Sequence, residues 1–123
     1  MKARPIDFDD VGGVDGAMRR IAIVRFAELL ALAPALRRGR PDELHALRIA
    51  CKRLRYALER FSNFEPALHA ASVRLAQLQD TLGNVHDRDV LLAALPGGAR
   101  NTLHRIRTQR DETVARSRAL LHD

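Results

Sequence analysis

The strongest pattern in the chain is a stretch from Leu44 to Phe61 in which apolar side chains recur every three or four positions. This spacing predicts an α-helix with one buried face. The apolar positions are Leu47, Ala50, Cys51, Leu54, Leu58 and Phe61. A neighbouring sector, roughly 80° wide at about 100° per residue, carries four basic side chains. These are His45, Arg48, Lys52 and Arg55.

The same kind of periodicity predicts four further helices. Their expected ranges are 15–32, 66–82, 84–95 and 100–121. Asp15 has the type of side chain that can cap the first of them. The last follows a Pro-Gly-Gly breaker and has only a thin apolar face. We expect the residues between the first helix and the basic one to form a linker.

A break is expected near the middle of residues 66–95. Gly83 suits a helix end in the left-handed conformation. Asn84, with Asp87 three residues later, resembles the start of a new, short helix. Val90 and Leu91 would then belong to the inner face of that helix.

Composition agrees with helices throughout. Alanine, leucine and arginine dominate, whereas the residues that favour strands are sparse. A chain of 123 residues suits one domain with a real core. We therefore expect an all-α bundle of about five helices, with residues 1–14 as an N-terminal tail and residues 15–123 as a single domain.

The formal net charge of +6 favours polyanionic partners. Coding bias is the other explanation for this charge, because 19 of the 21 basic residues are arginine. The chain has no run of about 18 apolar residues and no start typical of a secretion signal. We expect a cytoplasmic protein that does not span a membrane.

The four basic residues on one helix edge suit phosphate groups. The planar fork of arginine meets two phosphate oxygens at once, and positions one turn apart are separated by about 5.4 Å. His45 adds a donor when it is protonated. The alternative is an ordinary solvated flank of an amphipathic helix, and Glu59, four residues after Arg55, fits either interpretation. Spacing alone leaves both open.

A second basic group is expected on the last helix. Arg100, His104 and Arg107 lie at offsets of four and seven residues, which places them near one another on a helix surface. They are candidates for additional contacts with an anion, on helical geometry alone.

Catalytic and metal chemistry have little support. The five histidines are scattered, and His86, Asp87 and Asp89 do not form a ligand set by proximity alone. The single Cys51 excludes an internal disulfide and suits the core. Because the chain has no phosphate loop and no nucleophile motif, we expect no enzyme, no metal and no cofactor.

Nucleic acid is the main rival partner for a basic helical protein. Phosphate contacts alone would support weak, salt-sensitive binding. Four Phe, one Tyr and no Trp leave few stacking platforms for single strands, and no recognition-helix pattern stands out. We expect no specific nucleic-acid binding. A structural module that docks on another protein is the remaining alternative.

Two motifs follow one another along the chain. Residues 44–61 fit the pattern H-x-x-R-x-x-x-[KR]-x-[LR]-R, and residues 75–87 fit a helix ending in L-Q-x-x-L-G with a following Asp. The matching residues are His45, Arg48, Lys52, Leu54 and Arg55, then Leu78, Gln79, Leu82, Gly83 and Asp87. Together the two motifs resemble the CHAD domain, a family named for a histidine-bearing α-helical domain.

The resemblance implies a helical bundle that binds inorganic polyphosphate without catalysis. It carries over His45, Arg48, Lys52 and Arg55 as anion ligands. Tyr56, Gln79 and Asp87 also fit, with roles in packing, hydrogen bonding and helix capping. Association with polyphosphate granules in the cytoplasm would follow.

One departure from the family pattern concerns its repeat. A full CHAD domain is similar to two such bundles around a basic channel, whereas this chain carries the motifs once and resembles the second half. The resemblance covers about residues 15–95. We therefore expect either a half-domain that forms a homodimer, in which a two-fold axis sets two basic helices face to face, or a protein in which the channel is absent.

Overall fold

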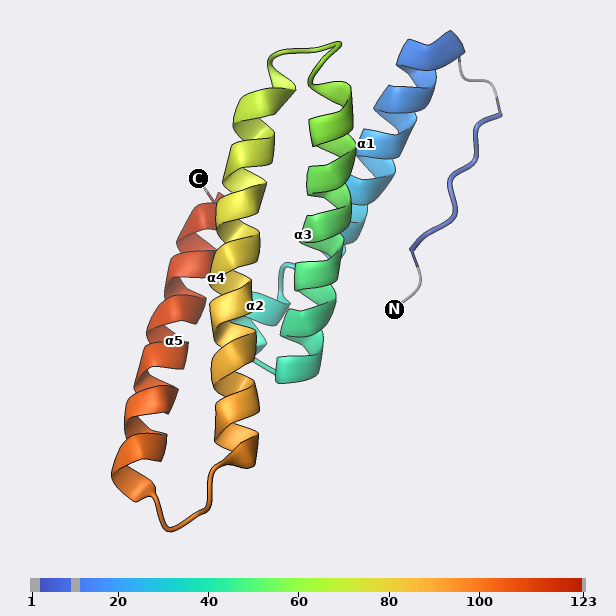
Figure 1. Ribbon diagram of the computed structural model, residues 1–123. Coiled ribbons are helices and arrows are strands. Elements are labelled where there is room, and N and C mark those ends of the chain that lie inside the picture. Colours follow the sequence, from blue (N-terminus) through green and yellow to red (C-terminus); the bar gives the residue numbers. More distant parts are fainter. Residues whose placement is uncertain (1–2, 10–11, 123) are drawn as a thin grey trace.

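The computed structural model describes residues 3–9 and 12–122, and all regular elements within these ranges are α-helices. They are α1 (Gly13–Leu32), α2 (Ala35–Arg38), α3 (Pro41–Phe61), α4 (Leu68–Ala94) and α5 (Arg100–His122) (Figure 1). The all-α bundle expected from the sequence is confirmed.

The long helices follow the order α1, α3, α4, α5 across the molecule. α3 packs against both α1 and α4, while α4 packs against α3 and α5 (Figure 1). Short α2 contacts α3 and α5. The hairpin of α4 and α5 extends beyond the start of α3 (Figure 1). α3 and α4 therefore form the central pair on which the other helices rest.

The apolar face of α3 supplies much of the core. All six positions predicted for it are buried, together with Leu44. All of them except Ala50 and Phe61 belong to one apolar cluster with Leu29 of α1, Leu36 of α2 and Leu78 of α4. Pro41 occupies the first turn, and Asp42 places negative charge at the helix end where the dipole favours it. α3 consequently begins one turn earlier than the periodic pattern.

The segment expected to be a linker contains α2. Ala35 and Leu36 are buried, and Gly39 ends the helix with a φ of 70°, a conformation that glycine adopts readily. Two arginines of α5 hold this turn, because Arg110 donates a hydrogen bond to the Gly39 carbonyl and Arg118 donates one to the Leu36 carbonyl. α2 thus connects the start of α3 to α5.

The break predicted at Gly83 is wrong, because α4 runs without interruption from Leu68 to Ala94. Gly83 is not in the left-handed conformation, and neither Asn84 nor Asp87 starts a helix. The buried sector continues across the glycine through Leu82 and Val85. Glycine inside a helix costs about 1 kcal/mol relative to alanine, whereas each buried aliphatic side chain contributes roughly 1.5–3 kcal/mol. Packing therefore outweighs the local signal.

Two smaller expectations are also wrong. Val90 and Leu91 are half-exposed, because this part of α4 lies beyond the start of α3 (Figure 1). Asp15 lies inside the first turn of α1, which begins at Gly13, and the helix has no side-chain cap. In α5, Leu103, Ile106 and Val114 are buried as predicted.

Hydropathy along the helices bears on membrane insertion. Among residues 3–9 and 12–122, no helix combines the length and apolar character that a membrane span requires.

Candidate functional site

The four basic residues of α3 lie on one edge of this helix, and three of them contact α4. Arg55 reaches Gln79, Arg48 lies beside Gly83, and His45 stacks on His86. These contacts occur in reverse order along the two helices, as antiparallel packing requires. We call this surface the cationic seam. It consists of His45, Arg48, Lys52 and Arg55 of α3 with Gln79, Gly83 and His86 of α4.

Arg48 is the least satisfied cation of the seam. Its side chain is partly buried, and its Nε is shielded from solvent without a hydrogen-bond partner in the described part of the chain. A Cβ placed on Gly83 would lie 3.7 Å from this Nε and 3.8 Å from Nη2. A shielded donor without a partner is unfavourable, so a ligand oxygen that reached it would be bound strongly.

Arg55 is held from two sides. Its Nη1 donates a hydrogen bond to Oε1 of Gln79 at 2.8 Å, and its Nε donates one to Oε1 of Glu59 at 3.0 Å. Glu59 therefore does pair with Arg55, as its position four residues later in the helix allows, and this pair fits both interpretations of the basic edge. Gln79 is neutral, so it fixes the guanidinium without cancelling its charge.

His45 is exposed and its ring stacks on that of His86, with 5.3 Å between the centroids and 30° between the planes. Sequence reasoning did not assign His86 to this site. The signal was present, because Gln79, Gly83 and His86 are spaced by four and three residues and so share one face of α4. The contact adds a second imidazole to this end of the seam.

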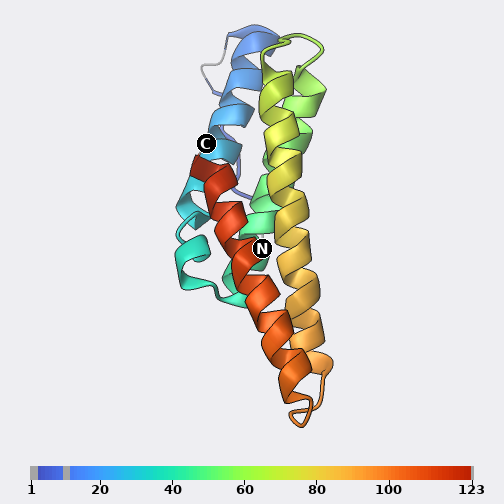
Figure 2. The same ribbon diagram turned by 90° about the vertical axis from the view of Figure 1, so that its left-hand side faces the viewer.

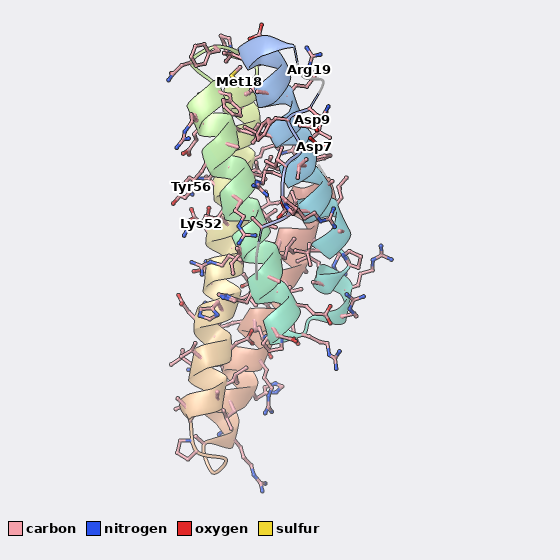
Figure 3. The ribbon with its side chains drawn as sticks, turned by 90° about the vertical axis from the view of Figure 1, so that its right-hand side faces the viewer. Asp7, Asp9, Met18, Arg19, Lys52 and Tyr56 are labelled. Carbon is pink, nitrogen blue, oxygen red and sulfur yellow. The ribbon has the colours of Figure 1, made fainter. Side chains whose placement is uncertain are left out.

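Lys52 and Tyr56 lie on the side of α3 away from α1 (Figure 3). The Lys52 ammonium is 5.8 Å from the centre of the Tyr56 ring, and the Arg55 guanidinium carbon is 5.1 Å from it. Cations near an aromatic face are attracted to it. Tyr56 thus packs between two cations, in keeping with the packing role that the family resemblance implied.

The second basic group does not join the seam. Arg100, His104 and Arg107 are exposed on the first turns of α5, near the end of the α4–α5 hairpin. α4 lies between α5 and α3 (Figure 1). The four basic residues of α3 therefore belong to one seam with α4, whereas Arg100, His104 and Arg107 lie apart from it.

Cys51 belongs to the core. It is fully buried, and its thiol donates a hydrogen bond to the Leu75 carbonyl at 3.2 Å. Burial raises the pKa of the Cys51 thiol to about 12, although the nearby Arg55 lowers it in part. A thiol with this pKa is a packing residue and not a nucleophile.

Acidic and histidine side chains were also candidates for a metal site. Within residues 3–9 and 12–122, no three His, Cys, Asp or Glu side chains gather closely enough to hold a metal ion. Asp89 instead forms an ion pair with Arg110 of α5. His86, three residues earlier in the chain, stacks on His45.

Comparison with known proteins gives one family. The model of the CHAD domain matches residues 15–96, a stretch that holds α1 to α4 and both halves of the cationic seam. Neither the curated proteins nor the solved structures gave a match. The matched stretch is about two thirds of the chain, and α5 lies outside it. This chain therefore belongs to the CHAD domain family, as a partial or half domain.

Proposed function

We propose that this protein binds inorganic polyphosphate at the cationic seam, without catalysis. The observation that carries the proposal is the placement of Arg48, a cation without a carboxylate partner in the described chain whose Nε is shielded and donates no hydrogen bond. Arg55 lies two turns further along α3, about 10.5 Å away by helical rise. A linear polymer with a charge on every unit reaches both arginines at once.

Each residue of the seam has a separate role in this proposal. Arg48 and Arg55 are held in place by α4 and offer forked donors to phosphate oxygens. Lys52, which is exposed between them, adds a mobile point charge. His45 and His86 add donors when they are protonated.

Longer polymers extend the contact. A polyphosphate chain that runs past the start of α3 reaches the end of the α4–α5 hairpin, where Arg100, His104 and Arg107 are exposed. We infer that these three residues favour long chains over short ones. Replacing Arg100 and Arg107 by glutamine would then weaken binding of long polyphosphate and leave that of short chains unchanged. Equal effects on both lengths would exclude this role.

The proposed setting follows from the ligand. Polyphosphate collects in cytoplasmic granules, and we place the protein there.

A homodimer, also expected from the sequence, doubles the number of seams that one polymer can meet. The rival interpretation is binding of duplex DNA through its phosphates. A titration with both polymers separates the two interpretations.

The test is a titration of polyphosphate, duplex DNA and ATP at two salt concentrations. Arg48→Gln with Arg55→Gln should weaken polyphosphate binding at least tenfold, because each removes a charge-assisted hydrogen bond of about 1.5–3 kcal/mol. The matched control is Arg60→Gln with Arg105→Gln, which removes the same charge from exposed positions outside the seam. Equal losses in the two double variants, or tighter binding of DNA at matched phosphate concentration, would overturn the proposal.

A further inference from the structure

An apolar groove opens on the side of the bundle where α1 and α5 lie. Its volume is about 470 Å³, and its walls come from α1, α3, α4 and the last turn of α5. Ile23 and Phe26 form the α1 wall, and Leu54 and Leu58 lie in the floor. Arg74 is the one charged residue among the described side chains that line it. A groove of this composition favours apolar groups.

The groove exists because α1 and α5 do not close over the central pair. α5 ends short of the upper end of α4, beside the lower part of α1 (Figures 1 and 2). Above this point only three long helices, α1, α3 and α4, are present, whereas a complete bundle has four. The upper part of the core is therefore open on one side.

α1 also keeps apolar side chains in solvent. Only Glu28 and Leu29 of this 20-residue helix are buried. Ile23, Phe26 and Leu30 are 58%, 51% and 52% exposed. Their offsets of three and seven residues place them on one face of α1. The same surface thus offers an apolar ridge and, beside it, an apolar groove.

We propose that a second copy of this chain covers this surface, with the two α1 helices packed across a two-fold axis near Phe26. A two-fold contact brings one surface patch against itself, so the patch must contain both a projection and a recess that receives it. The Ile23, Phe26 and Leu30 ridge and the adjoining groove meet this requirement. Each ridge enters the groove of the other copy.

The apolar area of this face suits the centre of an interface. Three half-exposed side chains of this size expose about 300 Å² of apolar surface, before the groove walls are added. Helix α1 spans about 30 Å, enough for packing along its whole length. Stable interfaces bury about 800 Å² per partner around an apolar centre. The ridge and groove supply that centre.

Charge also favours this face for self-association. Two copies with a net charge of +6 each repel one another, and the repulsion is least where charged side chains are few. The groove has one charged residue, Arg74, and the ridge has the exposed Arg19 four residues before Ile23. The cationic seam instead has two histidines together with Arg48, Lys52 and Arg55. This dimer keeps the two seams away from each other and open to ligand, unlike the face-to-face arrangement expected from the sequence.

The test measures the mass of the ligand-free protein by sedimentation. The natural chain should sediment at twice its mass of 13.8 kDa, and Phe26→Glu at the single mass. Val73→Glu is the matched control, because Val73 is an exposed apolar residue of α4 that does not line the groove. A monomeric natural chain, or a dimer that survives Phe26→Glu, would overturn the proposal.

A cross-linking experiment decides the matter even where Phe26→Glu disturbs folding. Phe26→Cys should be joined into a covalent dimer by a short bis-maleimide, and Val73→Cys should not. The native Cys51 is buried and does not compete. Cross-linking of both variants to the same extent, or of neither, would contradict the proposed axis. Neither measurement contains polyphosphate, so failure of the dimer and failure of the proposed function are distinguishable.

Discussion

Gly83 of α4 lies directly beside the guanidinium of Arg48 of α3, with room for a methyl group 3.7 Å from Nε. The glycine does not end a helix, as its surroundings in the sequence predict, because α4 continues for eleven more residues to Ala94. Its missing side chain lets the guanidinium of Arg48 lie close against α4, where Nε is shielded from solvent. A helix-weakening residue at this point therefore serves the placement of Arg48 and not the stability of α4.

Replacing Gly83 by alanine should stabilise the protein and weaken polyphosphate binding. Alanine gains about 1 kcal/mol of helix propensity, and its methyl group fits at ordinary contact distance. The same methyl group occupies space beside the Arg48 fork. Urea unfolding and calorimetric titration measure the two effects. Asn84→Ala, at the exposed neighbouring position, is the control, since it raises helix propensity without altering binding.

Removing the amide of Gln79 should lower polyphosphate affinity severalfold and change stability little. In Gln79→Ala, Arg55 loses its neutral partner at 2.8 Å and keeps only Glu59, whose negative charge opposes an anion. Glu59→Gln should act in the opposite direction. If Gln79→Ala and Glu59→Gln shifted the dissociation constant in the same direction, Arg55 would not act through its orientation and net charge.

The histidine pair predicts binding that depends on pH. Histidine side chains gain positive charge as pH falls from 8 to 5, and a positively charged imidazole attracts phosphate. His45→Ala with His86→Ala should therefore weaken polyphosphate binding more at pH 6 than at pH 8. His69→Ala, on an exposed part of α4 away from the seam, serves as the control. A loss that is equal at both pH values would assign the pair a packing role.

Cys51 predicts a loss of stability at alkaline pH. The folded thiol has a pKa of about 12, above the unfolded value of 9.0, so between these values the unfolded chain releases a proton that the folded chain retains. Stability is complete below pH 9 and falls as pH rises towards 12, by about 1 kcal/mol at pH 10. Urea unfolding at pH 8 and pH 10 should show a smaller fall in Cys51→Ala than in the natural chain.

The sequence predicts α3, apart from its first turn, because the pattern of this helix contains the needed information. Seven of its side chains are buried, and the six predicted apolar positions are among them. The basic sector is equally visible, since it depends only on helical spacing. No neighbouring element has to be known to place Arg48 and Arg55 on one edge.

The parts that sequence reasoning missed depend on the register of α3 against α4. His86 belongs to the seam only because that register sets it under His45. Gly83 and Asn84 are together typical of a helix end. The packing of Val85 against the core overrides this local preference. The short helix α2 is likewise stabilised from outside, by carbonyl contacts with arginines more than 70 residues away in sequence.

The single-sided attachment of α1 sets the order in which the molecule opens. α1 rests on α3 and is fixed there by the buried Glu28, which pairs with Arg25 of α1 and Arg53 of α3. α4, by contrast, is packed on both sides. In the monomeric Phe26→Glu variant, amide hydrogen exchange should therefore be faster throughout α1 than in α3 and α4, as expected for a unit that detaches on its own. Local opening of α1 would leave the α3–α4 pair intact. The basic edge of α3 would therefore keep its arrangement while α1, one of the four long helices, is detached.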